Sequence, residues 1–103
     1  MICISENERN IIINIISKYT PNFDVLAFGS RCNAVPKKYS DLDLAFLGNE
    51  KLGMKRRSQL ENAFSESDLP YQVDVVDYNV VSPEFQVIID EGNEKIFSAV
   101  GGK

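Results

Sequence analysis

The stretch Ser40-Asp41-Leu42-Asp43-Leu44-Ala45 decides the fold, because two aspartates alternate in it with two leucines. On a β-strand, residues two apart point to the same face of the sheet. Leu42 and Leu44 would therefore face the core, and Asp41 and Asp43 would lie side by side on the other face. Adjacent carboxylates repel each other, and Mg²⁺ relieves that repulsion because it prefers hard oxygen ligands. The pattern fits either a cation site or a polar strand face whose aspartates are solvated.

Upstream of this stretch, a glycine and a serine follow directly after a short apolar run at residues 24–28, which we expect to form a strand. Gly29 allows the backbone to turn tightly and to approach a ligand closely. Ser30 adds a hydroxyl donor to backbone N–H groups, which together suit an anion if a helix begins there. Because most Gly-Ser pairs are ordinary turns, the dipeptide by itself fits either a turn or an anion site.

Downstream, residues 71–78 predict a third strand, in which Asp74 stands among valines. A carboxylate in the middle of an apolar strand needs a partner if it is even partly buried. If this strand pairs beside the one that carries Asp41 and Asp43, three carboxylates converge. That is the ligand set of a two-metal site for phosphoryl or nucleotidyl transfer. Asp77, on the opposite face near the strand end, is the competing candidate, and we expect it to be solvated.

The N-terminal segment predicts a helix that begins at Ser5 and ends before Pro21. Ser5 and Glu8 have the spacing of a capping box, in which each side chain bonds the backbone N–H of the other residue. Isoleucines recur at helical spacing and give this helix one apolar face. A second helix with a thin apolar stripe is expected over residues 52–64.

Near the C-terminus, Ser82 and Pro83 mark the start of a third helix, because serine caps helices and proline fits the first turn. Gly92 ends this helix, and residues 95–100 predict a closing edge strand. Three residues form the apolar face of the helix: Phe85, Ile88 and Ile89. This order of helices and strands predicts an α/β fold, with helices packed against a small mixed sheet that carries the carboxylates.

The composition is that of one globular domain over residues 1–103. Lys and Arg total 11 against 15 Asp and Glu, and the net charge of −4 argues against direct nucleic-acid binding. The absence of histidine excludes Ser-His-Asp and Cys-His nucleophiles and His-ligated zinc. Two separated cysteines, Cys3 and Cys32, suggest a reducing compartment. With no signal peptide or apolar run of membrane length, we expect a cytoplasmic protein with no membrane contact.

One basic cluster lies at the start of the second expected helix, and it consists of Lys51, Lys55, Arg56 and Arg57. Charge runs on helices usually face water. The cluster therefore fits a solvated helix face or, alternatively, a patch for an acidic partner or a nucleic acid.

Together, three segments resemble the DNA polymerase β-type nucleotidyltransferases: Phe28-Gly29-Ser30-Arg31, Ser40 to Ala45, and Val73-Asp74-Val75-Val76-Asp77. Their size and spacing are similar to those of the minimal nucleotidyltransferases, the small antitoxin partners of HEPN-domain toxins. The resemblance spans about residues 8 to 98, and it implies the α+β fold of that superfamily.

The resemblance implies a role for each matched residue. Asp41 and Asp43 would ligate Mg²⁺. Asp74 would ligate the second of two ions, the one nearer the attacking hydroxyl, and could accept the proton of that hydroxyl. The glycine and serine, Gly29 and Ser30, would hold the β- and γ-phosphates of ATP.

Arg31 would lie near the same phosphates. In the family, AMP passes from ATP to a tyrosine of the HEPN toxin, which blocks its ribonuclease activity. Family members commonly continue Gly-Ser-Arg-Ala-Arg-Gly, whereas this chain continues Cys32-Asn33-Ala34.

We therefore expect a Mg²⁺-dependent antitoxin that transfers AMP to a tyrosine of a cognate HEPN toxin. A binding-only antitoxin is the first alternative, which the altered loop favours and the three intact aspartates disfavour. An enzyme acting on a small molecule or a nucleic acid is the second alternative. The lack of a second domain and the negative net charge weigh against it.

Overall fold

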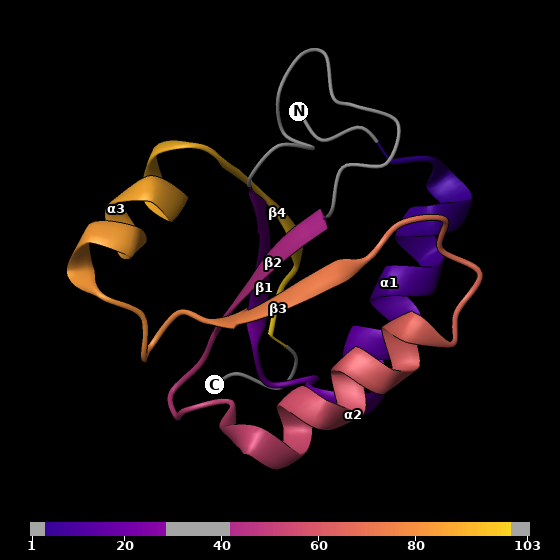
Figure 1. Cartoon of the computed structure of the whole chain (residues 1–103), viewed down its shortest axis with the longest axis horizontal. Helices are drawn as coiled ribbons and strands as arrows, with labels where there is room; N and C mark the ends of the chain where they lie inside the picture. Colours follow the sequence, from indigo (N-terminus) through magenta and orange to yellow (C-terminus); the bar gives the residue numbers. More distant parts are fainter. Residues whose placement is uncertain (1–3, 29–41, 100–103) are drawn as a thin grey trace.

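The computed structural model describes residues 4–28 and 42–99 (Figure 1). The expected order of helices and strands is confirmed. The elements are α1 (Glu6–Tyr19), β1 (Asp24–Phe28), β2 (Leu42–Leu47), α2 (Gly53–Ser65), β3 (Val73–Asp77), α3 (Pro83–Glu91) and β4 (Asn93–Phe97). The closing strand β4 begins earlier than expected, directly after the glycine that ends α3.

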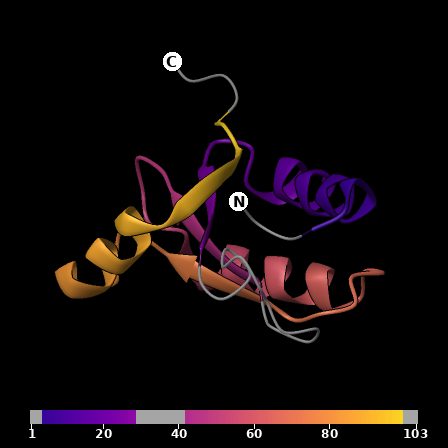
Figure 2. The same cartoon turned by 90° about the horizontal axis from the view of Figure 1, so that it is seen from above.

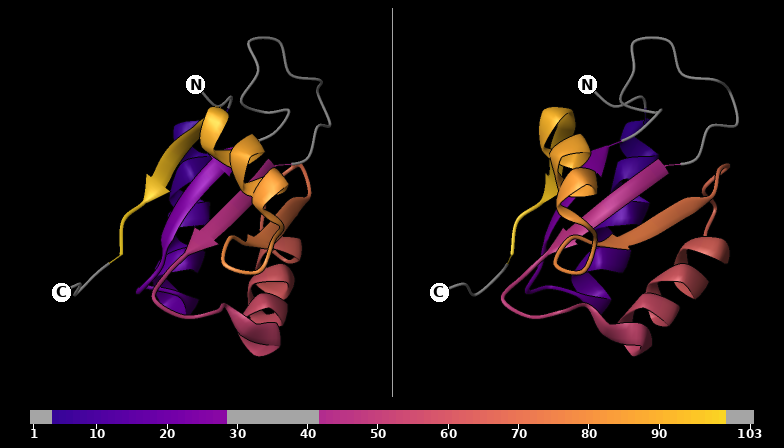
Figure 3. Two further views of the ribbon diagram at one scale, coloured as in Figure 1. Left: turned by 90° about the vertical axis from the view of Figure 1, so that its left-hand side faces the viewer. Right: turned by 60° about the vertical axis from the view of Figure 1, so that its left-hand side comes forward.

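The strands form one mixed sheet in the order β3-β2-β1-β4. β1 is antiparallel to both β2 and β4, whereas β2 and β3 are parallel. A parallel pair needs a crossover connection, and α2 supplies it. The strand order places β3 and β4 at the two edges of the sheet, and α2 packs beside β3 (Figure 3).

α1 and α2 cover one face of the sheet (Figure 2). Every second residue of the strands points into this core, as the alternation of Leu42 and Leu44 predicted. The expected stripes of both helices are buried against it, including Ile12 and Ile16 of α1 and Leu60 of α2. The strand residues in this core are Val25, Ala27, Leu42, Leu44, Phe46, Val73, Val75 and Ile96.

α3 packs on the opposite face, over a smaller cluster that includes Phe28, Ala45 and Ile89. The rings of Phe28 and Phe85 meet edge to face, with centroids 5.8 Å apart. The expectation that Ile88 belongs to the buried face of α3 is wrong, because its side chain is 58% exposed. Consecutive helical residues are turned by about 100°, so a short helix that buries Ile89 turns Ile88 outward.

Both predicted N-terminal caps are present. Ser5 Oγ accepts a hydrogen bond from the Glu8 N–H, and Glu8 Oε1 accepts one from the Ser5 N–H, each at 3.1 Å. Ser82 Oγ likewise accepts from the Phe85 N–H at the start of α3. In the described ranges, every helix is too short or too polar to span a lipid bilayer.

Candidate active site

Asp43 and Asp74 lie side by side on the face of the sheet that carries α3. They are register partners in the parallel pair of β2 and β3. Because neighbouring strands are about 4.8 Å apart, two carboxylates in register on one face are immediate neighbours. The sequence predicted that these carboxylates converge if their two strands pair. The pairing of β2 with β3 confirms this for Asp43 and Asp74.

The other predicted site residues, Gly29, Ser30, Arg31 and Asp41, lie outside the described residues. The residues on either side of that segment are described, and they belong to neighbouring strands. Phe28 at the end of β1 is the register partner of Asp43, one residue after the start of β2. The chain thus leaves β1 and enters β2 at the end of the sheet that holds the two aspartates.

The two aspartates open into a cavity of about 450 Å³. α2 and α3 both contribute to its walls, although they lie on opposite faces of the sheet, because the cavity reaches around the edge strand β3. Sequence reasoning missed this lining, since helical spacing does not reveal which helix surfaces meet across a sheet edge. The described residues that line it are Phe28, Asp43, Arg57, Glu61, Asp74, Val75, Val76, Phe85 and Ile88.

The charge in this cavity is predominantly negative. Its described lining holds three carboxylates, Asp43, Asp74 and Glu61, and one cation, Arg57. Arg57 Nε donates to Glu61 Oε2 at 3.2 Å, so the only cation of this lining already has an acidic partner. Gln72 Nε2 donates to Asp74 Oδ1 at 3.3 Å on the exposed side of β3. The excess of negative charge suits a cation.

The donor chemistry fits magnesium. Mg²⁺ is usually held by one or two carboxylates together with substrate phosphates, and not by a complete protein cage. Asp43 and Asp74 supply two such carboxylates in register. Within residues 4–28 and 42–99, no three His, Cys, Asp or Glu side chains gather to hold a metal, and Asp41 falls outside these ranges.

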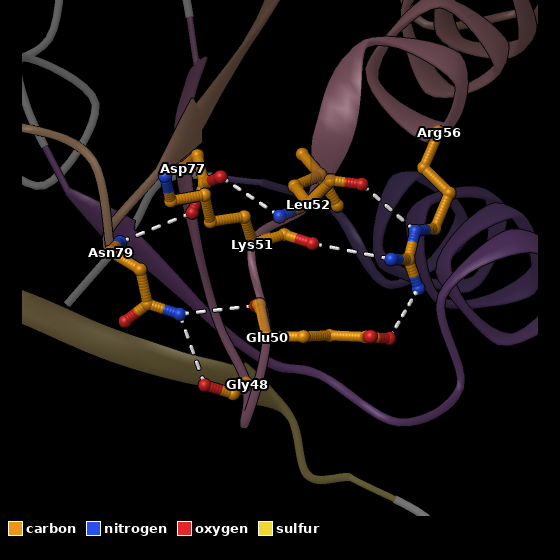
Figure 4. A network of polar contacts seen from close by, with 7 residues as sticks. All are labelled: Gly48, Glu50, Lys51, Leu52, Arg56, Asp77 and Asn79. Atoms are coloured by element: carbon orange, nitrogen blue, oxygen red, sulfur yellow. Dashed lines mark hydrogen bonds and ion pairs between the residues drawn. The ribbon is translucent and has the colours of Figure 1, made fainter.

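The prediction that Asp77 is solvated is wrong. The sequence interpretation treated it as solvated, yet only 7% of it is exposed. Its Oδ2 accepts a hydrogen bond from the Leu52 N–H at 2.8 Å, and its Oδ1 accepts from the Asn79 N–H at 3.1 Å (Figure 4). Alternation along β3 turns Asp77 to the α2 side, where the start of α2 has no side-chain cap of its own. Asp77 therefore caps α2 from another element and is not part of the carboxylate pair.

The network around Asp77 joins the end of β3 to the connection between β2 and α2. Asn79 Nδ2 donates to the carbonyl oxygens of Gly48 and Glu50, at 3.0 and 3.1 Å (Figure 4). Together with the Asp77–Leu52 bond, they anchor the start of the α2 crossover to the C-terminal end of β3.

The basic cluster divides into structural and exposed members. Arg56 Nε donates to the carbonyl oxygen of Leu52 at 2.8 Å, and Arg56 Nη1 forms an ion pair with Glu50 at 3.0 Å. Its guanidinium also lies over the Phe23 ring, 5.1 Å from the centroid. Arg56 is thus part of the packing, whereas Lys51 and Lys55 are exposed.

The comparisons with known proteins agree with this geometry. Residues 10–100 match the family model described as "Polymerase beta, Nucleotidyltransferase". The chain is 45% identical over 86 residues to a Haemophilus influenzae protein named "Probable protein adenylyltransferase MntA", which covers 84% of this chain and 75% of that protein.

Two solved structures share the fold. One is a toxin–antitoxin crystal structure with AMP-PNP, with a TM-score of 0.76 and 24% identity over 89% of this chain and 74% of that one. The other contains a tri-AMPylated Shewanella oneidensis HEPN toxin in complex with an MNT antitoxin. Its TM-score is 0.69, with 23% identity over 90% of this chain and 71% of that one. With the family model matching nearly the whole chain, this protein belongs to the polymerase β nucleotidyltransferase family.

Proposed function

We propose that this chain is an antitoxin that transfers AMP from ATP to a tyrosine of a cognate HEPN-domain toxin and thereby neutralises it. The observation that carries the proposal is the register pairing of Asp43 with Asp74 at an open, acidic cavity. The relative from Haemophilus influenzae, 45% identical, is named as an adenylyltransferase that acts on protein. The solved structures that share the fold of this chain include a toxin–antitoxin structure with AMP-PNP and a complex that contains an AMPylated HEPN toxin.

Asp41, Asp43 and Asp74 are the proposed ligands of two Mg²⁺ ions. When bound, Mg²⁺ supplies positive charge against the oxygens that enter and leave the reacting phosphorus. Asp43 and Asp74 have the oxygen donors and the adjacency that such a pair of ligands needs. Asp41 is assigned from the family resemblance of its segment, because it lies outside the described residues.

Asp74 has a second proposed role, as the general base. The tyrosine oxygen forms a bond to the α-phosphorus of ATP, and the bond from that phosphorus to the oxygen bridging to the β-phosphorus breaks. Pyrophosphate leaves, and the phenolic proton passes to the Asp74 carboxylate. β3 is an edge strand and β2 is an inner one, so Asp74 is the member of the pair that an acceptor can approach from outside the sheet.

Gly29, Ser30 and Arg31 are proposed to hold the triphosphate. The positions of Phe28 and Leu42 support this assignment, because the segment between them starts and ends beside Asp43. The proposal treats residues 1–103 as one nucleotidyltransferase domain and places the reaction in the cytoplasm, where ATP and Mg²⁺ are available.

Intact mass spectrometry tests the function directly. The HEPN-domain protein encoded beside this gene is mixed with the chain, with and without Mg²⁺ and ATP. We expect the HEPN protein to gain one or more AMP units only in the complete mixture, and to gain none with the variant D41N/D43N. Stable co-purification without a gain in mass would replace the proposal with neutralisation by binding alone.

A further inference from the structure

Four large apolar side chains are mostly exposed among the described residues. They are Met54 at 86%, Val80 at 55%, Val87 at 52% and Ile88 at 58%. Single exposed apolar residues need no explanation. Three of these four, however, line hollows that adjoin each other, and such a grouping is typical of an interaction surface.

Arg57 connects the two hollows. It lines the catalytic cavity together with Ile88, Asp43 and Asp74. It also lines a second hollow of about 200 Å³, whose other walls include Met54 and Val80. An apolar strip therefore runs from Met54 at the start of α2, past Val80, to Ile88 at the rim of the carboxylate pair. α3, the start of α2 and the connection between β3 and α3 lie on one side of the molecule (Figure 3).

The exposed charges at the Met54 end of this strip are positive, whereas the Ile88 end borders the acidic cavity. Lys51 lines the second hollow, and Lys55 follows it one helical turn later on the exposed surface. Neither lysine forms an ion pair with any residue in the described ranges. We call Lys51 and Lys55 the basic border. Because the chain as a whole has a net charge of −4, a positively charged border at this place favours an acidic partner.

Polar contacts hold α3, the helix that carries Ile88, against the rest of the fold. The Tyr78 hydroxyl donates to Asp90 Oδ1 at 3.0 Å, and Gln86 Nε2 donates to the carbonyl oxygen of Tyr78 at 2.8 Å. Asn93 Nδ2 donates to the carbonyl oxygen of Ile89 at 2.8 Å. These bonds fix the rotation of α3 and keep Ile88 pointed at the cavity.

We propose that the strip formed by Met54, Arg57, Val80 and Ile88 is the docking surface for the acceptor protein. The inference rests on the proposed function and adds where the acceptor binds and what it presents. The occupant is a segment that carries the modified tyrosine near Asp74, apolar side chains in the hollow of Met54 and Val80, and acidic residues opposite Lys51 and Lys55. The acceptor would enter past β3, which lies at an edge of the sheet.

A matched pair of variants tests the surface, because Ile88 and Val87 are neighbours of the same chemistry and similar exposure. Only Ile88 lines the cavity. We expect I88D to raise the KM for the HEPN protein by about tenfold or more, and V87D to change neither the KM nor kcat. M54D is expected to act like I88D, with its loss of rate recovered at high acceptor concentration. Circular dichroism and thermal melting check that each variant folds.

The role of Lys51 and Lys55 is tested by measuring the KM for the HEPN protein at increasing salt concentration. We expect the KM for the HEPN protein to rise with ionic strength in the wild-type chain, and K51Q/K55Q to raise it at low salt and to flatten this dependence. If the wild-type chain transfers AMP but I88D and V87D have equal effects on the KM, the docking surface is overturned and the proposed function stands. A wild-type chain that transfers no AMP would overturn the function and, with it, this inference.

Discussion

Asp43 of β2 and Asp74 of β3 are direct register partners in the single parallel strand pair of the described sheet. Like charges placed opposite each other on neighbouring strands destabilise a sheet. Their adjacency is therefore a cost to the fold unless a cation lies between them. The same adjacency is what a metal-dependent phosphoryl transfer needs, so this pair is where stability and function oppose each other.

Replacing Asp74 by Asn is expected to lower the rate of AMP transfer by about a hundredfold or more, because it removes a general base and a ligand together. The fold is expected to persist, since Asn has nearly the same shape and relieves the repulsion with Asp43. AMP incorporation into the HEPN protein and the melting temperature measure the two effects. Asp68→Asn, at an exposed acid outside the cavity, is the control and should retain full activity.

Magnesium is expected to stabilise the wild-type chain. A ligand that binds only the folded state adds about 2.7 kcal/mol when its free concentration is 100 times its Kd. Thermal melting with increasing MgCl₂ should show a rising Tm for the wild type and a much smaller rise for D43N/D74N. The same rise in both proteins would show that Mg²⁺ binds elsewhere.

Asp77→Ala is expected to destabilise the protein by about 1–3 kcal/mol, because it leaves the buried Leu52 N–H without an acceptor. Asp77→Asn keeps one acceptor oxygen, so its effect should be smaller. Urea denaturation gives the free energies of unfolding. An Asp77→Ala variant as stable as the wild type would contradict the capping role described for this side chain.

Gly48→Ala is expected to destabilise the fold by about 1–3 kcal/mol through overpacking. A Cβ at this position would lie 2.7 Å from two atoms of the Phe23 ring, which is itself buried. Gly92→Ala is the matched control, because a Cβ there meets nothing within 4 Å. Urea denaturation of the two variants should separate them, and G48A/F23L should recover part of the loss.

The pKa of Tyr78 is expected to lie above its ordinary value. The hydrogen bond to Asp90, with partial burial and the negative charge of Asp90, raises the pKa of Tyr78 above its ordinary value of 10.0. Because the unfolded chain loses this phenolic proton first, the contribution to stability is complete below pH 10 and declines as the pH rises beyond it. Absorbance titration of the wild type and Tyr78→Phe identifies the transition, which Asp90→Asn should move to lower pH.

Local sequence patterns predicted much of the fold. The alternation in residues 42–47 identified which side chains of β2 face the core under α1 and α2, because strand faces follow a period of two whatever the strand pairs with. The caps at Ser5 and Ser82 were equally readable, since each capping bond spans only three residues. The family resemblance of the three quoted segments was confirmed by the match to the family model.

Asp77 shows where local patterns end. Its face was readable from the alternation with Val73 and Val75, but its partner, the Leu52 N–H, lies 25 residues away. Without that partner a carboxylate at a strand end is naturally interpreted as solvated. The outward turn of Ile88 was hidden for the same reason, because helical spacing gives an apolar face but not the width of the surface that covers it.

The sequence by itself determined the order of the elements and the faces of the strands, because these depend on neighbours within a few residues. The spacing of three segments along the chain identified the family. Only the tertiary structure decided that β2 and β3 pair in parallel register, and so made Asp43 and Asp74 neighbours. It also brought Arg57 of α2 and Ile88 of α3 to one cavity. Such meetings depend on how the whole chain packs its apolar surface around the sheet, and no short stretch of sequence contains that information.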